Sequence, residues 1–82
     1  MHTPQAHAEG MAAFIAATLR EIRAHVAQHQ PVDLSGMPWD IGRLCAACLD
    51  LPPEQGRDMR PCLQEVSREI DALQSALLEA GP

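Results

Sequence analysis

Aromatic residues are almost absent from this sequence: Phe14 and Trp39 make up 2% of its 82 residues, and there is no tyrosine. Strands are enriched in aromatic and β-branched residues, whereas helices favour alanine, which supplies much of the 46% hydrophobic content. The shortage of aromatic residues therefore argues against a β-sheet and predicts an all-α fold.

Basic residues are also few, with 6 against 11 acidic residues and a net charge of −5. Binding to a phosphate backbone or to an anionic membrane surface requires a cluster of lysine or arginine, and the sequence has none. We therefore expect neither nucleic acid nor a membrane as a partner.

Long apolar runs and secretion signals are missing as well. The longest uncharged run, from Gly10 to Leu19, is too short to cross a bilayer, and residues 1–4 lack a basic region followed by an apolar one. The 3 cysteines cannot all pair within one chain. We therefore expect a cytoplasmic protein without a disulfide framework.

Common catalytic motifs are absent as well. The sequence has no glycine-rich phosphate loop, no HExxH helix and no nucleophile elbow. The carboxylates of Glu65, Glu69 and Asp71 lie three residues from Arg68 or close to it, the spacing of a solvated helix face with ion pairs. The protein is therefore predicted to be no enzyme and to use no cofactor.

What is present is helical periodicity along one domain, residues 1–82, because half of this length could not bury a core of its own. A first helix over about 4–29 begins with Thr3 as cap and Pro4 as first helical residue. Its apolar stripe recurs every three or four residues: Met11, Ile15, Leu19, Ile22 and Val26. Residues 30–37 form a connector rich in proline and glycine.

A second helix over about 38–51 and a third over about 53–80 follow, the third with a kink near Pro61. The third has a coiled-coil-like seam: Met59, Leu63, Val66, Ile70, Leu73 and Leu77. We expect a three-helix bundle, or a long helical hairpin with a shorter middle helix, in either case a candidate for dimerisation. Trp39 is expected to close one end of this bundle.

The cysteines and two of the histidines are the one group of residues that could serve a chemical role, as ligands of a metal ion. Cys45, Cys48 and Cys62, with His25 and His29 one helical turn apart, could in principle hold zinc. Core packing explains the cysteines better, since cysteine is often buried and this pair lies within a helix. A surface position near a helix end explains the histidines better. We therefore predict no metal.

Several short stretches resemble short uncharacterised bacterial helical proteins associated with flagellar gene neighbourhoods. The stretches are Val32-Asp33-Leu34-Ser35-Gly36, Leu44-Cys45 and Leu51-Pro52-Pro53-Glu54-Gln55-Gly56-Arg57, followed by the leucine-periodic helix. In size, acidity and helical plan the chain is also similar to the flagellar type III export chaperones. This resemblance implies a chaperone or adaptor that binds a flagellar subunit, and it assigns no binding residue.

The function predicted from the sequence is a helical protein-binding module. The expected partner-binding groove is lined by Phe14, Leu19, Val26, Leu73, Leu77 and Leu78, because some of these residues lie off the seams of their helices. A self-associating homodimer is the first alternative, because the same seam could pair with a second copy. A small metal-binding regulator built on the cysteines and histidines is the second alternative.

Overall fold

The computed structural model describes residues 3–80, and within that range it contains helices and no strands. The helices are α1 (Pro4–Ala27), α2 (Met37–Leu49), α3 (Pro53–Asp58) and α4 (Arg60–Glu79). The prediction of an all-α fold is therefore confirmed.

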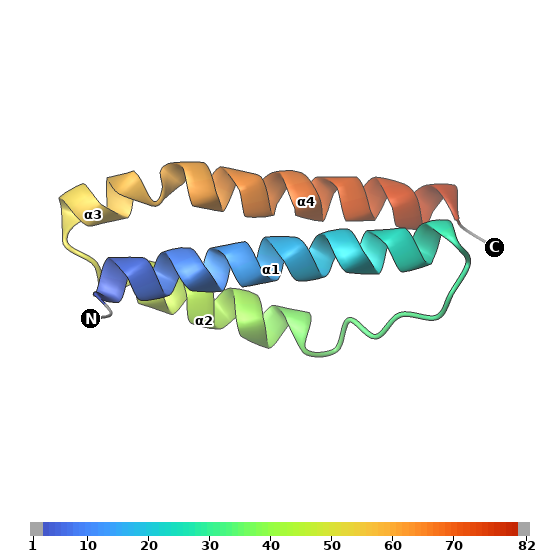
Figure 1. The fold of residues 1–82 in the computed structure, drawn as a ribbon, viewed down its shortest axis with the longest axis horizontal. Coiled ribbons are helices and arrows are strands. Elements are labelled where there is room, and N and C mark those ends of the chain that lie inside the picture. Colours follow the sequence, from blue (N-terminus) through green and yellow to red (C-terminus); the bar gives the residue numbers. More distant parts are fainter. Residues whose placement is uncertain (1–2, 81–82) are drawn as a thin grey trace.

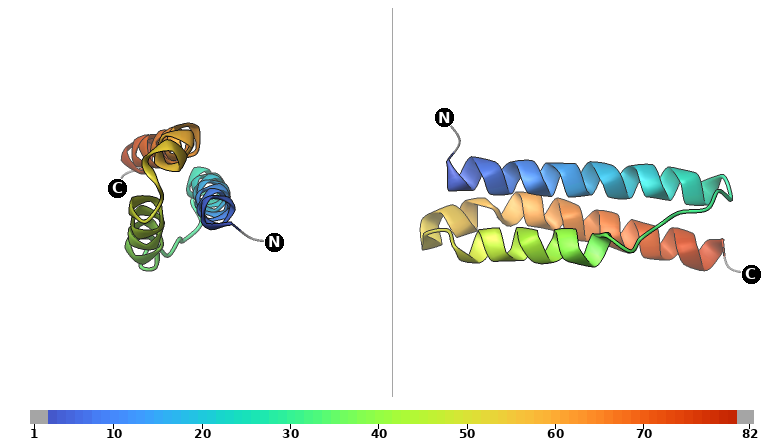
Figure 2. Two further views of the ribbon diagram at one scale, coloured as in Figure 1. Left: turned by 90° about the vertical axis from the view of Figure 1, so that its left-hand side faces the viewer. Right: turned by 90° about the horizontal axis from the view of Figure 1, so that it is seen from below.

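The helices form an elongated body with principal extents of 45 × 18 × 18 Å. Chain direction alternates: α1 and α4 run the same way, and α2 runs in the opposite direction (Figure 1). Seen end-on, α1, α2 and α4 stand at the corners of a triangle (Figure 2). Helix α1 packs most extensively on α4 and less on α2, so α1 is the shared partner of the other two long helices.

Both ends of α1 are closed by local hydrogen bonds. The Thr3 hydroxyl accepts a hydrogen bond from the Ala6 amide at 3.0 Å, and Pro4 occupies the first turn, where its missing N–H costs nothing. At the other end His29 has a left-handed φ of 58°, and the Gln30 amide donates back to the His25 carbonyl at 2.9 Å. The helix therefore ends at Ala27, two residues before the expected end.

The connector of residues 28–36 reaches α2 through a short ordered turn. The Asp33 carboxylate accepts a hydrogen bond from the Ser35 amide at 2.9 Å, as an Asx turn does. Val32 and Leu34 are partly buried against the core, which fixes the connector to the bundle. Helix α2 then starts at Met37 and ends at Leu49, before the diproline Pro52-Pro53.

The last helical segment is interrupted at Met59, where the sequence predicts one kinked helix over 53–80. Pro61 has no N–H to donate to the Arg57 carbonyl, so the helical ladder cannot continue through it. The Met59 amide instead bonds to both the Gln55 and Gly56 carbonyls at 3.2 Å. The Met59 side chain is fully buried at this break, which fixes α3 and α4 to the same core.

The core combines three alanines of α1 with larger apolar residues of α1 and of the segments around it. Its buried residues are Ala8, Ala12, Ile15, Ala16, Leu19, Val26, Leu44, Leu51, Met59, Val66 and Leu73. Alanines four residues apart lie on one face of a helix, so α4 can approach α1 closely there. Trp39 takes no part in the core and is 70% exposed, so the prediction that it closes one end of the bundle is wrong.

Candidate protein-binding surface

An apolar groove lies on the open side of the triangle, between α2 and α4. It has a volume of about 560 Å³. Its lining residues are Leu19, Leu34, Met37, Pro38, Ile41, Gly42, Ile70, Leu73, Gln74 and Leu77. Leu19 of α1 forms the floor, and Gln74 is the one polar side chain in the lining. Unlike the α1 contacts, the α2 to α4 contacts are few, so this side of the bundle is left open.

The groove continues along α2 as an exposed stripe without charge. Its members are spaced three or four residues apart and so share one side of the helix: Pro38, Gly42, Cys45, Ala46 and Leu49. All five are exposed, and Leu49 protrudes furthest, with 85% of its surface exposed. The stripe therefore extends the groove over most of the length of α2.

The side of α4 that lines the groove is uncharged as well: it is formed by Ile70, Leu73, Gln74 and Leu77. Nearer α3, Leu63 and Ser67 border a different hollow together with Arg57 and Arg60. We name the groove-lining side of α4, the groove and the α2 stripe together the α2/α4 face. In a chain with 21% charged residues, this uncharged surface makes the α2/α4 face a candidate binding surface.

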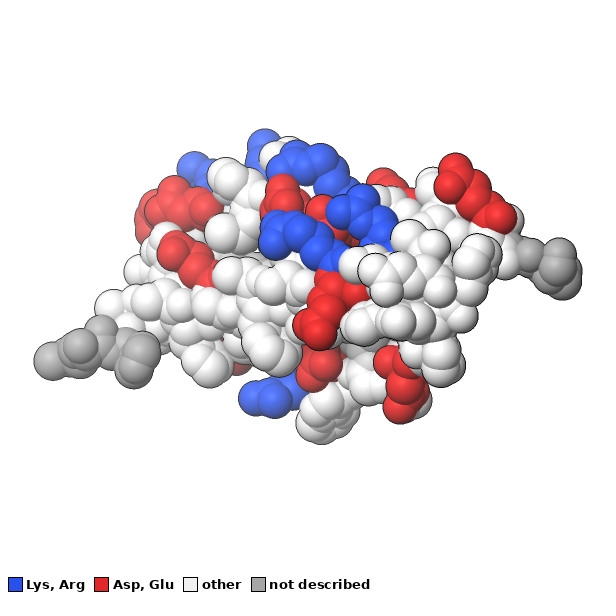
Figure 3. All heavy atoms as spheres, turned by 45° about the vertical axis from the view of Figure 1, so that its right-hand side comes forward, with Lys and Arg blue, Asp and Glu red and all other residues white. Residues whose placement is uncertain are grey.

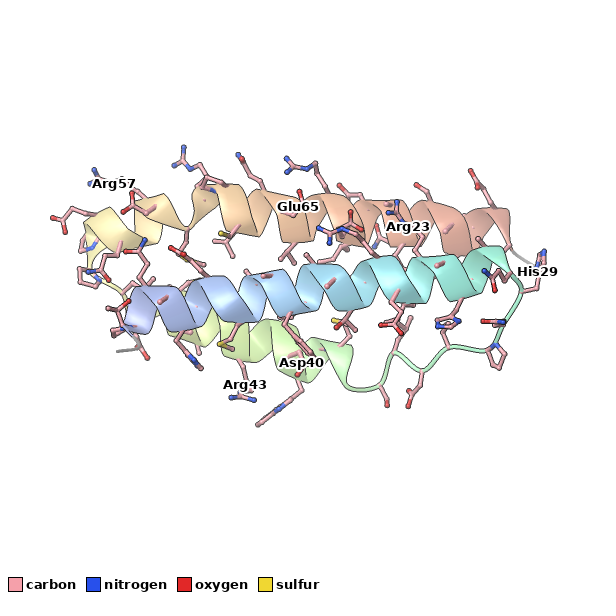
Figure 4. The ribbon with its side chains drawn as sticks, viewed as in Figure 1. Arg23, His29, Asp40, Arg43, Arg57 and Glu65 are labelled. Atoms are coloured by element: carbon pink, nitrogen blue, oxygen red, sulfur yellow. The ribbon has the colours of Figure 1, made fainter. Side chains whose placement is uncertain are left out.

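The charges of α2 lie elsewhere on that helix. Asp40 and Arg43, which are labelled in Figure 4, border a hollow beside Phe14 on α1, and neither lines the groove. Phe14 is 68% exposed there and belongs to this second, smaller surface. The two sides of α2 are therefore chemically distinct, one charged and one not.

A cluster of ion pairs joins α1 to α4. Arg20 donates a hydrogen bond to Glu65 at 2.8 Å and approaches Glu69 within 3.5 Å, while Arg23 lies 3.3 Å from Glu69. Arg68 adds a 2.6 Å bond to Glu65 from the same helix. Figure 3 shows arginine and glutamate side chains interleaved on this part of the surface.

Glu69 is the buried member of the cluster, with 9% of its surface exposed. One of its carboxylate oxygens, Oε2, accepts no hydrogen bond within the described chain, so the nearby Arg23 guanidinium balances its charge across 3.3 Å. A buried carboxylate held this way depends on both arginines. The sequence predicts Glu69 on a solvated face, whereas in the structure it is buried in contact with α1.

Glu65 and Asp33 have perturbed acidities. Hydrogen bonds from Arg68 and then Arg20 hold the pKa of Glu65 below its usual range. The Ser35 amide, which donates to the Asp33 carboxylate, lowers the pKa of Asp33 in the same way. Both shifts come from structural hydrogen bonds, and neither group lines the groove.

The predicted partner-binding residues divide into three groups. Leu19, Leu73 and Leu77 line the groove, the first two as largely buried walls. Val26 is 5% exposed and belongs to the core, so it offers no surface to a partner. Phe14 and Leu78 are exposed but lie outside the groove. The six residues therefore do not line one groove, and their role in binding a partner stays a prediction.

The three cysteines lie on different parts of the bundle, and Cys62 borders a hollow between α1 and α4. Cys45 is exposed on the α2 stripe, whereas Cys48 and Cys62 pack partly buried against the core. Burial raises the pKa of the Cys48 thiol, and neighbouring Cys45 and Cys62 raise it further. This environment disfavours the thiolate that metal binding and redox chemistry require.

The histidines do not share the helix face that the sequence suggested. His29 lies beyond the end of α1 with a left-handed backbone, while the His25 ring contacts Gln30. Among residues 3–80, no group of three or more histidine, cysteine, aspartate or glutamate side chains is arranged to hold a metal ion. The geometry therefore lends no support to the metal-binding alternative.

None of the helices in residues 3–80 combines the length and apolar character needed to cross a membrane. Searches against protein-family models, curated proteins and solved structures found no match to this chain. Its function must therefore be argued from its own residues.

Proposed function

We propose that this chain is a non-enzymatic, cytoplasmic protein-binding module that docks an amphipathic helix on its α2/α4 face. The observation that carries the proposal is the apolar groove of about 560 Å³ between α2 and α4, open to solvent and extended by an uncharged stripe. Helices bind such grooves by inserting apolar residues spaced three or four apart. The parallel α1 and α4 pair supplies a rigid base for the docked helix.

The ion-pair cluster supports this assignment by its position. Charged contacts between Arg20, Arg23 and Glu69 fix α4 against α1, on a different side of the helix from the groove. An ion-pair network of this kind sets register and orientation more than it adds stability. In this account the α1 to α4 pairing is fixed, and α2 and the connector form the adaptable wall of the site.

A flagellar export chaperone or adaptor is the specific form of this function that we propose. Its support is the sequence resemblance through the connector, α2 and α3, together with the small, acidic, all-helical character of the chain. Such a chaperone would cover an apolar helix of a subunit before export. The identity of the bound protein distinguishes this form from other helical adaptors.

The test uses three forms of the tagged chain: wild type, Gly42→Glu and Gly10→Glu. Each substitution adds one carboxylate to an exposed helical glycine, and a side chain at either position meets no atom within 4 Å. Gly42 lines the groove and Gly10 lies on α1, outside it. The pair is therefore matched in chemistry and differs in location.

We expect wild type and Gly10→Glu to co-purify one protein in stoichiometric amount from their native cells, and Gly42→Glu to lose it. The protein is identified by mass spectrometry and must rebind when both components are pure. A partner retained by Gly42→Glu would contradict the proposed site. Recovery of no protein at all, further copies of the chain included, would contradict the proposed function.

A further inference from the structure

Resting on the proposed function, we propose that in the absence of another protein the helix docked on the α2/α4 face is α2 of a second copy of this chain. In this symmetric dimer the α2 helices pack antiparallel, with Leu49 of each copy over Gly42 of the other. The face provides both the protruding residue and the open position that such a contact requires. Gly42 borders the groove with open space above its Cα, and Leu49 is the most exposed of the large apolar residues.

The spacing of these two positions fits a two-fold axis. Gly42 and Leu49 are seven residues apart, which is about 10 Å along a helix. An axis midway between them passes Cys45 and Ala46, and antiparallel packing then pairs each Leu49 with the Gly42 of the other copy. Gly42, Cys45 and Ala46 are small enough for the two helix backbones to approach closely. An isologous contact requires this self-complementarity.

The surface area of the chain is compatible with the area that such a dimer would bury. The single chain exposes 5751 Å², whereas a compact monomer of its mass of 8.9 kDa exposes about 4,800 Å². The excess is about 950 Å², and the elongated shape of the body, 45 × 18 × 18 Å, contributes to it. It is large enough for the roughly 800 Å² that each partner buries in a standard interface.

Charge is compatible with self-association through this face. Each copy carries a net charge of −5, so two copies repel one another unless their contact is uncharged. The α2 stripe has no charged member, while Asp40 and Arg43 lie on the side of α2 toward Phe14. Two acidic chains can therefore meet on this face without burying a carboxylate.

The first test is the molecular mass of the purified chain by sedimentation equilibrium. Because interfaces of standard size bind with micromolar to picomolar affinity, the wild-type chain should be a dimer at about 100 µM. Gly10→Glu should remain a dimer. Gly42→Glu should raise the dimer dissociation constant at least about 100-fold, because it buries two unpaired carboxylates at the interface. Circular dichroism confirms that both variants remain helical.

The second test locates the axis with the thiol of Cys45. The double variant Cys48→Ala, Cys62→Ala leaves Cys45 as the single thiol of the chain. A short bismaleimide should link two copies covalently through Cys45, and adding Gly42→Glu should abolish the link. A dimer that forms without this cross-link has its axis elsewhere and overturns the inference.

Other results also overturn the proposed dimer. A wild-type monomer at about 100 µM contradicts it, since an interface of this area should hold at that concentration. A dimer that persists in Gly42→Glu, or one lost equally in Gly10→Glu, contradicts the proposed contact. A monomer that binds a different purified protein, lost only in Gly42→Glu, refutes the dimer and leaves the proposed function intact.

Discussion

Replacing Gly42 with alanine should stabilise the single chain and weaken its self-association. Gly42 lies in the interior of α2 with a negative φ, and an added Cβ meets no atom within 4 Å. Glycine in a helix interior costs about 0.8–1 kcal/mol relative to alanine, and no clash offsets that gain here. For a domain of this size, about 1 kcal/mol corresponds to an increase in Tm of roughly 4–8 °C.

Thermal and urea unfolding should be measured in a Leu49→Glu background, so that association does not contribute. Leu49 is 85% exposed, and its replacement removes no core contact. Gly10→Ala in α1 is the matched control and should stabilise by a similar amount. In the wild-type background Gly42→Ala should also raise the dimer dissociation constant, and Gly10→Ala should not. A Gly42→Ala variant less stable than its parent would refute the geometry described for α2.

Three further predictions concern the core, the ion pairs and the end of α1. Leu44→Ala should lower the free energy of unfolding, measured in urea, by about 3–5 kcal/mol, and Leu19→Ala should lower it by about 2–3 kcal/mol. The loss is smaller for Leu19 because the space it leaves opens into the groove, where water can fill it. Equal losses would contradict this. The lowered pKa of Glu65 stabilises the fold above its unfolded pKa near 4.5 and is lost as pH falls through the lower folded value, so Glu65→Gln should flatten acid unfolding monitored by circular dichroism. His29→Gly should raise stability by about 1 kcal/mol, since His29 holds a left-handed φ of 58°, and an unchanged Tm would contradict that conformation.

Helix periodicity in the sequence predicts which face of each helix is buried. The stripe that includes Ile15, Leu19 and Val26 is buried in the structure, and the seam of the last helix supplies Val66 and Leu73 to the core. The cap at Thr3 is also as predicted. These features depend on residues within a turn or two of one another, which a sequence shows directly.

Features that depend on which helices meet were missed. The sequence around Glu69 predicts a surface residue. Its burial depends on the parallel packing of α1 and α4, in a register that places Arg20 and Arg23 next to its carboxylate. Trp39 reads as a core residue because its neighbours are apolar, yet it lies past the edge of the groove-facing side of α2. Periodicity gives the apolar side of a helix but does not say what covers it.

The α2 stripe is visible in the sequence as a second side of the helix without charge. Within α2 the charged residues are Asp40 and Arg43, and the positions Pro38, Gly42 and Leu49 recur on the other side without a charge. Packing against the other helices of the bundle accounts for one apolar side of α2. It does not account for a second side without charge. The number of uncharged sides of α2 therefore distinguishes the α2 stripe in the sequence alone.

Binding of a partner or a second copy to the α2/α4 face is tested most directly by backbone amide NMR. Spectra are compared between dilute and concentrated protein, or before and after addition of a purified partner. The account predicts shift changes that concentrate on Gly42, Cys45 and Leu49 of α2 and on Ile70 and Leu77 of α4. Changes centred on α1 around Phe14, with α2 unaffected, would contradict it.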